Sequence, residues 1–569
     1  MINHAAVARG DMPADLVIKN AKIANVFTLD YELADVAVYA GKIAGIADNY
    51  DGKEIFDADG KVLIPGMIDG HVHIESTMLA PPVFADEVVK RGTTAVMADP
   101  HEISNALGMA GLEYMHNASF GLPIDIFLGA PSCVPASQFE TPYEELNMIA
   151  IKSMFEDKLG QHLGEMMNFP ALIAGDPEVW GKIAAAGDVP LTGHAPNVSG
   201  KALNAYLVSG VNSDHECSNL DEAREKLRRG MWLMIREGAS FPNLKTLLPL
   251  LKQNPLYYSR CMAITDDVTA LYLSEVGHMD AKVKIMINEG LDPLIALRLV
   301  TLSPAEYFRL WDRGAVAPGR RADFALIDSL EKFNVLQVWK DGRQVVRDGE
   351  LVKKSNNNIA MPNINIKITP PQPHQIKVKA SGSLINVIGV SQGEVITKTL
   401  LKAPLVDNGF VISDTQNDIV KIVVMERHRN TGRLAVGFVN GLGIKRGAIA
   451  SSVAHDAHNF VAAGVSDAAI INAITELCKT GGGFTVAEDN KILGTLPLPI
   501  GGLMTNLSAH ETADALAELE IRAGELGVKI SHPFMALSFL CLSVIPELRI
   551  TDQGYVDITK GGIQPLFVQ

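Results

Sequence analysis

The stretch Leu63-Ile-Pro-Gly66-Met-Ile-Asp69-Gly-His71-Val-His73 is an apolar run, broken by a Pro-Gly turn signal, that ends on an acid and two histidines. Side chains at i and i+2 of a strand point to the same face, so the two imidazoles lie side by side at a strand end. Neighbouring imidazoles chelate metal ions. The stretch therefore predicts a metal site at the end of a buried strand.

Strand-like runs alternate with helical stretches from this motif onward. Alternation of this kind predicts a parallel sheet with crossover helices, and eight strand-helix units predict a closed (β/α)₈ TIM-like barrel in an α/β protein. The eight candidate strands are 62–68, 93–98, 124–129, 161–167, 189–193, 211–213, 231–235 and 260–264.

Short alternating strands with tight turns lie on both sides of the predicted barrel. We expect residues 1–66 and 307–360 to form one small split β-sandwich-like domain around a barrel of residues 67–306. Residues 361–377 are rich in proline and follow three asparagines, which is typical of a linker. Residues 378–569 contain a strand at 419–425 and helices at 466–478 and 512–526, and they predict a separate C-terminal α+β domain.

Polar side chains end most of the candidate barrel strands. Active sites of such barrels gather at the carboxyl ends of the strands, so side chains far apart in the sequence converge there. A single histidine or aspartate at such a position is often a surface or helix-capping residue, but this many at successive strand ends favour a metal centre. The predicted metal ligands are His71, His73, Glu165, His194, His215 and Asp266.

Charge and cysteine content exclude several classes of protein. The formal net charge of −15 opposes non-specific binding to nucleic acid and docking on an anionic membrane. Five scattered cysteines without a CxxC pair predict neither a disulfide framework nor a zinc finger. The beginning of the chain lacks the apolar core of a signal peptide, and we expect a cytoplasmic protein.

These motifs resemble the amidohydrolase superfamily and, within it, the bacterial adenine deaminase family. The narrower resemblance covers nearly the whole chain and lies in extra stretches around the ligands. These are His71-Val-His-Ile-Glu75-Ser-Thr-Met78, Asp99-Pro-His101-Glu102-Ile103, Ala174-Gly-Asp-Pro-Glu-Val179, Ser213-Asp-His215-Glu216, Ser451-Ser-Val-Ala-His455-Asp456-Ala-His458-Asn459 and Leu496-Pro-Leu-Pro-Ile-Gly-Gly-Leu-Met504.

The resemblance implies hydrolysis of adenine to hypoxanthine and ammonia in purine salvage, by a metal-activated hydroxide that attacks C6. It implies two divalent ions, with Mn²⁺ favoured over Fe²⁺ or Zn²⁺, and a homo-oligomer, either a dimer or a tetramer. His71, His73 and Asp266 would hold one ion, and His194 and His215 the other. Lys152 and Lys158 precede the end of the fourth strand, so Glu165 rather than a modified lysine would bridge the ions.

The resemblance also suggests roles for the remaining acids and histidines. Asp266 is the expected proton acceptor, Glu102 or Glu216 the acid that protonates N1, and His101 a group that orients the base or the leaving amine. A second reading of these residues, as partners that fix the metal-bound imidazoles, is equally open. Substrate contacts are expected from Glu75, Arg236, His455, Asp456, His458 and Asn459.

The cluster from His455 to Asn459 has several possible roles: a third metal site, a lid, part of a subunit interface, or a polar loop. A rival activity is hydrolysis of a cyclic amide, as in dihydroorotases and hydantoinases. Glu75 stands where such an enzyme places an arginine, which opposes an anionic substrate, whereas Arg236 keeps the rival open. A barrel without catalytic activity would have lost ligands, and no ligand position is lost.

Overall fold

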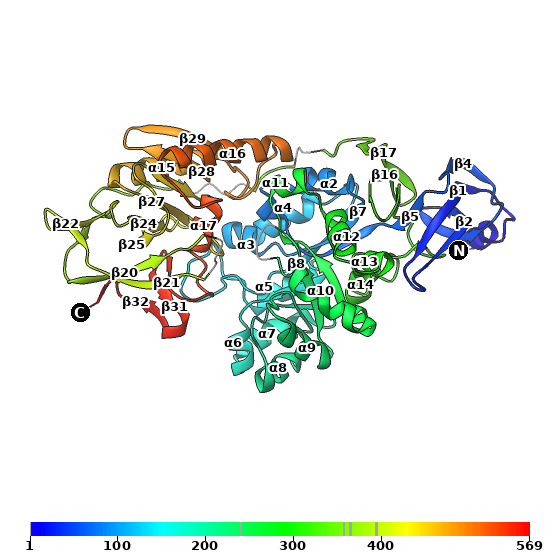
Figure 1. Ribbon diagram of the computed structural model, residues 1–569, viewed down its shortest axis with the longest axis horizontal. Helices are drawn as coiled ribbons and strands as arrows, with labels where there is room; N and C mark the ends of the chain where they lie inside the picture. Colours follow the sequence, from blue (N-terminus) through cyan, green and yellow to red (C-terminus); the bar gives the residue numbers. More distant parts are fainter. Residues whose placement is uncertain (1, 239–241, 357–358, 363–366, 393–395, 569) are drawn as a thin grey trace.

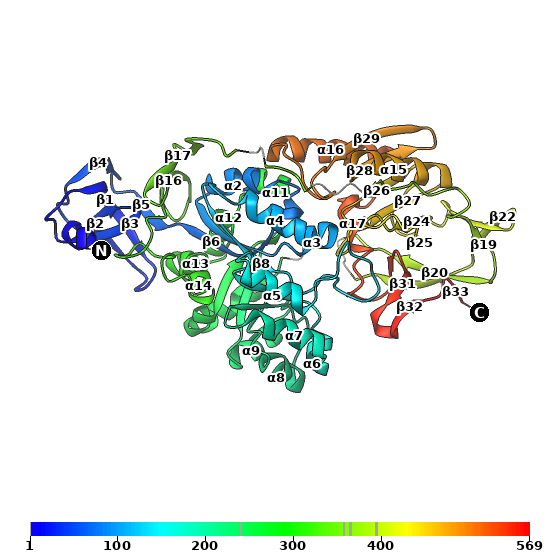
Figure 2. The same ribbon diagram turned by 180° about the vertical axis from the view of Figure 1, so that it is seen from behind.

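The computed structural model describes residues 2–238, 242–356, 359–362, 367–392 and 396–568. The molecule is elongated and has three parts in a row (Figures 1 and 2). A β-sheet that contains the N-terminal strands lies at one end, the barrel lies in the middle, and the C-terminal residues form the other end.

The central part is the predicted parallel α/β barrel. Two parallel ladders run in the order β10-β9-β8-β7-β6-β14 and β11-β12-β13. β10 lies against β11 and β13 against β6, which closes the ring. The strands are β6 (Met67–His73), β7 (Thr93–Ala98), β8 (Asp125–Ala130), β9 (His162–Met166), β10 (Leu191–Gly193), β11 (Ser213–Asp214), β12 (Trp232–Arg236), β13 (Cys261–Ile264) and β14 (Asp266–Asp267).

The first predicted strand, 62–68, is in fact two strands in two different sheets. β5 (Val62–Pro65) pairs with β1 and β15 outside the barrel, whereas β6 pairs with β7 inside it. The change occurs at Gly66, whose N–H donates to Asp323 O, while the next N–H, of Met67, donates to Gly92 O. A Cβ at Gly66 would lie 2.2 Å from Thr94 Oγ1, so only glycine fits where the chain crosses between sheets.

The outer sheet is built from both flanks of the barrel. The order of strands in this sheet is β18-β17-β16-β15-β5-β1-β2-β3, with β4 paired to β1. Phe324 and Trp339 are buried in its core. The sequence boundaries of this domain stay a prediction. Its strands are β1 (Ala14–Asn25), β2 (Asp30–Tyr39), β3 (Lys42–Ala47), β4 (Gly52–Asp57), β15 (Phe324–Ile327), β16 (Val335–Lys340), β17 (Arg343–Arg347) and β18 (Glu350–Leu351).

Helices cover the outside of the barrel, and their apolar residues belong to one large core together with the strands (Figure 1). They include α2 (Pro81–Val89), α3 (His101–Leu107), α4 (Met109–Ala118), α5 (Met148–Glu156), α7 (Pro177–Ala186), α8 (Gly200–Leu207), α9 (Leu220–Arg228), α10 (Leu244–Gln253), α12 (Met279–Asn288) and α13 (Pro293–Leu299).

The C-terminal part is a mixed sheet with helices packed on it. Its main strands are β24 (Ile419–Met425), β25 (Leu434–Asn440), β26 (Ala448–Ser451), β27 (Phe460–Gly464), β28 (Gly483–Glu488) and β29 (Lys491–Pro497). The helices are α15 (Asp467–Thr480), α16 (Ala509–Glu525) and α17 (Pro533–Phe539). Ser466 Oγ accepts the N–H of Ala469 and caps α15, as the sequence pattern predicted.

The predicted linker 361–377 is only partly described, because residues 363–366 lie outside the described residues. Its C-terminal portion is packed on the sheet. Ile376 is fully buried in a core cluster with Val423, and its carbonyl oxygen accepts a hydrogen bond from Lys421 Nζ at 3.0 Å. These contacts differ from those of a free linker, since an apolar side chain and a buried lysine fix this segment.

The loop that follows β8, residues 131–147, joins the barrel to the C-terminal part. Thr141 donates from its N–H and its Oγ1 to the Asp552 carboxylate at 3.2 and 2.7 Å. Ser137 Oγ lies 2.6 Å from Ser543 Oγ. All four side chains are largely shielded from water, so these hydrogen bonds hold the two parts in a fixed relation.

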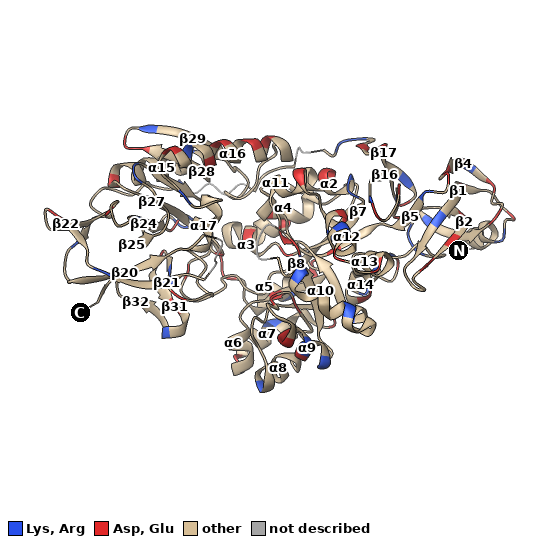
Figure 3. Ribbon diagram, in the orientation of Figure 1, with Lys and Arg blue, Asp and Glu red and all other residues tan. Residues whose placement is uncertain are grey.

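Charged residues of both signs are interspersed along the ribbon, with acidic residues prominent on α16 (Figure 3). Among the described residues, no helix combines the length and apolar character needed to cross a membrane.

We expect Asp552→Ala to lower the free energy of unfolding by about 2–4 kcal/mol, because it leaves two donors of Thr141 buried without an acceptor. Urea denaturation followed by circular dichroism measures this loss. Asp221→Ala is the matched control, since the Asp221 side chain is 94% exposed and pairs only with Arg224 at the surface. Equal destabilisation by the two substitutions would contradict the proposed importance of the loop contact.

Candidate metal centre

Six side chains from five positions around the barrel meet at the carboxyl ends of its strands. His71 and His73 end β6, Glu165 lies in β9, and His194 and His215 directly follow β10 and β11. Asp266 begins β14, next to β6. The side chains are buried, except that of His194, which is 20% exposed. The structure thus brings together all six predicted metal ligands.

Glu165 stands between two pairs of histidines. Its Oε1 lies 3.2 Å from His73 Nε2 and 3.7 Å from His71 Nε2. Its Oε2 lies 2.9 Å from His194 Nδ1 and 3.2 Å from His215 Nε2. Because each oxygen faces a different pair, one carboxylate has the geometry needed to bridge two ions.

Asp266 closes the first half of this arrangement. Its Oδ1 lies 3.2 Å from His73 Nε2 and 3.7 Å from His71 Nε2, and its Oδ2 accepts a hydrogen bond from Arg236 Nη1 at 2.8 Å. The backbone of Asp266 has a φ of +61°, a conformation that costs a non-glycine residue energy and that is common at functional sites.

Hydrogen bonds and neighbouring charges set the tautomers and the protonation of the histidines. His73 Nδ1 lies 3.0 Å from Asp99 O, and a carbonyl can only accept, so Nδ1 carries a proton and Nε2 is the nitrogen left for a metal ion. Burial alone would lower the pKa of His73, but Asp266 and Glu165 hold it well above its usual range, so a metal ion has to displace a proton from Nε2. Burial, together with His215 and His73, lowers the pKa of His71 to about 3, which keeps that ring neutral. His71 Nε2 is buried without a hydrogen-bond partner in the structure.

Burial alone would raise the pKa of Glu165, but hydrogen bonds from His194, His215 and His73 hold it well below its usual range. Burial would also raise the pKa of Asp266, but a hydrogen bond from His73 and the charge of Arg236 hold it well below its usual range. Imidazole nitrogens and carboxylate oxygens are the donor set that Mn²⁺, Fe²⁺ and Zn²⁺ accept. The residues present therefore fit divalent metal ions.

Comparison with known proteins shows the family of the chain. The amidohydrolase family model matches residues 62–345, and the adenine deaminase C-terminal domain model matches residues 394–561. "Adenine deaminase" of Dehalococcoides mccartyi is 44% identical over 98% of this chain and 98% of its own length. "Adenine deaminase 2" of Carboxydothermus hydrogenoformans is 43% identical over 98% of each chain. The chain belongs to the adenine deaminase family.

Among solved structures, a β-aspartyl dipeptidase from Fervidobacterium islandicum is 18% identical and covers 61% of this chain and 100% of its own, with a TM-score of 0.47.

A second set of polar side chains lies beside the six in this member of the adenine deaminase family. His101 Nδ1 is 3.6 Å from Asp99 Oδ1, and its Nε2 is 3.7 Å from Asp456 Oδ1. Glu102 faces His455 and His458 at 3.6 and 4.0 Å. The C-terminal residues suggested by the sequence therefore form part of the wall of the barrel mouth.

Three other residues that the sequence suggested, Glu75, Arg236 and Glu216, form hydrogen bonds or ion pairs within the protein. Glu75 Oε1 accepts the N–H of Ile103 at 3.2 Å, and burial beside Glu102 raises the pKa of Glu75 to about 7. Arg236 forms ion pairs with Glu216 and Asp266.

Asn459 differs from the expectation that it contacts substrate. Its Oδ1 accepts the N–H of Arg427 at 3.1 Å and its Nδ2 donates to Thr141 O at 3.1 Å. Both ends of the amide are thus used to join the C-terminal part to the loop 131–147. Asn459 therefore has a structural role, and its contact with the substrate stays a prediction.

Three aspartates that position the centre were not selected from the sequence. Asp99 Oδ2 accepts the N–H of Glu165 at 2.6 Å, and Asp69 accepts from Thr265 and from the N–H of His71. Asp214 accepts the N–H of Ala195, next to His194, at 2.7 Å. Each lies within two residues of a predicted functional histidine in the sequence, and this adjacency was the available signal.

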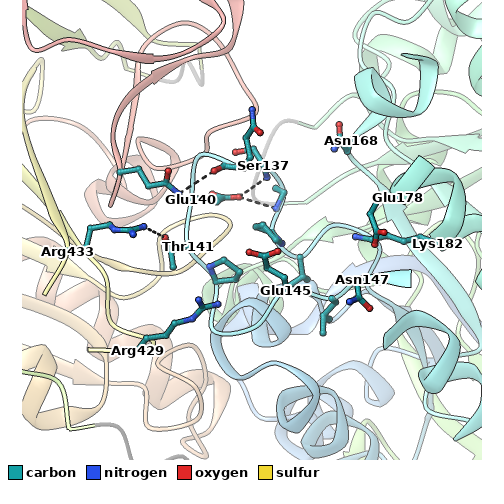
Figure 4. A pocket seen from close by; sticks show the side chains of 17 residues that line it. Ser137, Glu140, Thr141, Glu145, Asn147, Asn168, Glu178, Lys182, Arg429 and Arg433 are labelled. Atoms are coloured by element: carbon teal, nitrogen blue, oxygen red, sulfur yellow. Dashed lines mark hydrogen bonds between the residues drawn. The ribbon is translucent and has the colours of Figure 1, made fainter. Parts of the chain in front are cut away.

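A cavity of about 460 Å³ is lined by residues of the loop 131–147 (Figure 4). Glu178 and Lys182 of α7 line one wall, and Arg429 and Arg433 of the C-terminal part line the other. None of the clustered histidines lines it. It lies behind Glu165, since Lys182 Nζ donates to Ser132 O and Ser132 Oγ donates to Glu165 O.

We expect removal of divalent ions by a chelator to lower the unfolding temperature, and restored ions to raise it again. An ion at about 100 times its dissociation constant stabilises the native state by about 2.7 kcal/mol. Differential scanning calorimetry measures the shift. Glu165→Gln should abolish it, whereas His510→Ala, at an exposed position on α16, should retain it. If the chelator leaves the unfolding temperature of the wild-type protein unchanged, that result would contradict a metal centre here.

Proposed function

We propose that this protein hydrolyses free adenine to hypoxanthine and ammonia at the centre around Glu165. The observation that carries the proposal is the carboxylate of Glu165 between two histidine pairs. Its support is the family membership over the full chain, including the C-terminal part. Water adds to C6 of the purine, the C6–N6 bond breaks, and the amine leaves as ammonia.

His71, His73 and Asp266 would hold one divalent ion and His194 and His215 a second, with Glu165 between them. Divalent ions in such a site supply a water whose pKa is lowered toward neutrality. Asp99 and Asp69 fix the backbone on which these ligands stand, so the ligand atoms are oriented before any ion binds.

Asp266 is our choice for the proton acceptor. Its Oδ1 faces the same space as His71 and His73, where we propose that the attacking water is held. Arg236 holds the other oxygen, which keeps the carboxylate turned toward that space. From there Asp266 takes the proton of the water and delivers it to the departing amine, a transfer typically worth 10²–10⁴-fold in rate.

Glu216 is our choice for the group that exchanges a proton with N1. Its Oε1 lies 3.5 Å from His215 Nε2 and 3.9 Å from His194 Nδ1, at the partly exposed side of the centre. Glu102, the other acid that the sequence suggested, faces the C-terminal part instead. We propose that His101, held between Asp99 and Asp456, orients the base.

The rival activity on cyclic amides with a carboxylate loses its main support. It depended on Arg236 as an anion-binding group, and that guanidinium is ion-paired with Glu216 and Asp266. Glu75 and Glu102 add further negative charge nearby, which disfavours an anionic substrate.

Finer parts of the proposal rest on the sequence and the family. We propose Mn²⁺ as the preferred ion, with Fe²⁺ or Zn²⁺ as alternatives, and two ions per chain. We further propose a cytoplasmic enzyme of purine salvage that assembles as a dimer or tetramer.

The deciding experiment is ammonia release by manganese-loaded protein from adenine, other aminopurines, dihydroorotate and hydantoin. We expect release from adenine and none from dihydroorotate or hydantoin. His73→Ala should lower the rate by at least 10³-fold, because it removes a side chain that faces both Glu165 and Asp266. His510→Ala serves as the control. Unchanged activity of the His73 variant would refute the proposed site.

Asp266→Asn tests the proton transfer separately. The amide keeps the size of the side chain but accepts a proton poorly, so we expect kcat to fall by about 10²–10⁴-fold. Steady-state kinetics gives kcat, and elemental analysis of the same sample gives the metal content. A variant with full kcat would exclude Asp266 as the proton acceptor.

A further inference from the structure

Two buried side chains on facing parts of the molecule direct polar atoms toward each other without bonding. His458, on the C-terminal part, places its Nε2 4.0 Å from Oε2 of Glu102, in α3 of the barrel. Both residues are almost completely buried. Neither atom has a hydrogen-bond partner in the structure. A buried polar atom without a partner is costly, so such a pair points to a ligand that bonds to both.

The tautomer of His458 is fixed by its surroundings. The backbone N–H of Ala454 donates to His458 Nδ1 at 3.2 Å, so Nδ1 is the acceptor and the ring proton is on Nε2. Burial, together with His455 and Arg427, holds the pKa of His458 well below its usual range, which keeps the ring neutral. Nε2 is therefore a hydrogen-bond donor, and it has no lone pair to offer a metal ion.

The backbone around His458 is held firmly. Arg427 Nε donates to His458 O, and the Arg427 N–H donates to Asn459 Oδ1. His458 has a φ of +54°, in the left-handed region that few non-glycine residues adopt. The donor is thus preorganised relative to the barrel.

Glu102 supplies the acceptor. Its Oε1 lies 3.1 Å from Ser76 Oγ, a hydroxyl that Asp267 shares, and 3.6 Å from His455 Nδ1, whereas Oε2 has no hydrogen-bond partner among the described residues. An N–H donor and an oxygen acceptor side by side match a ligand edge with an adjacent ring nitrogen and N–H. The free adenine base has such an edge at N3 and N9–H. That edge lies across the molecule from C6, which must face the metal centre.

We propose that His458 and Glu102 recognise the N3/N9 edge of the free base, with Nε2–H of His458 donating to N3 and Oε2 of Glu102 accepting from N9–H. This inference rests on the proposed deaminase function and adds the substrate edge that is read. A nucleoside carries its sugar on N9, so it has no N–H for Glu102 and adds bulk where the two parts meet. The pair selects free bases over nucleosides.

The test compares kcat/KM for adenine, 3-deazaadenine, 9-methyladenine and 7-deazaadenine in the wild type and in variants. In the wild type we expect the ratio of kcat/KM for adenine to that for each of 3-deazaadenine and 9-methyladenine to be high. The variant that lacks the matching contact should lower that ratio by about tenfold to a hundredfold. In His458→Leu the preference over 3-deazaadenine should collapse, while that over 9-methyladenine persists. Glu102→Gln should show the reverse pattern. Comparing ratios removes the intrinsic reactivity of each purine.

The controls separate recognition from general damage. His458→Gln retains an N–H donor and should recover part of the preference for N3. Thr141→Val weakens the loop contact without touching the base, so it should change all four substrates alike. 7-Deazaadenine keeps both N3 and N9–H and should follow adenine through every variant.

Three outcomes are informative. Failure of the wild type to deaminate adenine would overturn the proposed function itself. Deamination of adenine with substrate ratios that are the same in wild type and His458→Leu would overturn this inference alone. The crossed loss of the two preferences would support it.

Discussion

The carboxylate of Glu165 is the contact around which the mouth of the barrel is organised. Its two oxygens face two histidine pairs that come from three different strand ends. Asp99 accepts the backbone N–H of Glu165, so the backbone of this residue is fixed as well as its carboxylate. Removing this one side chain would leave His71, His73, His194 and His215 without the carboxylate that both pairs face.

The histidines show how one residue type provides two kinds of chemistry. His73 donates from Nδ1 to a carbonyl and so leaves Nε2 for a metal ion. His458 accepts at Nδ1 from a backbone N–H and so offers a proton at Nε2. The backbone atom beside each ring, rather than the ring itself, decides between ligand and donor. Sequence motifs do not report this difference, because both residues simply appear as histidine.

Much of the barrel and its ligands could be predicted because local patterns encode them. The strands alternate with helices, and the ligands directly follow strand ends. The strand prediction joined 62–68 into one strand, although the Pro-Gly signal and the expected domain boundary after residue 66 lie inside it, because the apolar pattern does not reveal that its two halves pair with different sheets. The contacts of Asn459 and the pairing of Arg236 also escaped prediction. Asn459 contacts Thr141, 318 positions away, and Arg236 contacts acids that follow other strands, so only the folded chain brings these partners close.

The loop 131–147 has a consequence for synthesis of the chain. A ribosome releases the metal-binding strands first, and the segment with His455, His458 and Asp552 emerges much later. Until then the C-terminal part to which this loop bonds is absent, and the barrel mouth is open to water. A nascent or truncated barrel would thus contain the residues proposed to activate water before the C-terminal residues proposed to select the substrate are present. Selectivity in this chain is completed last.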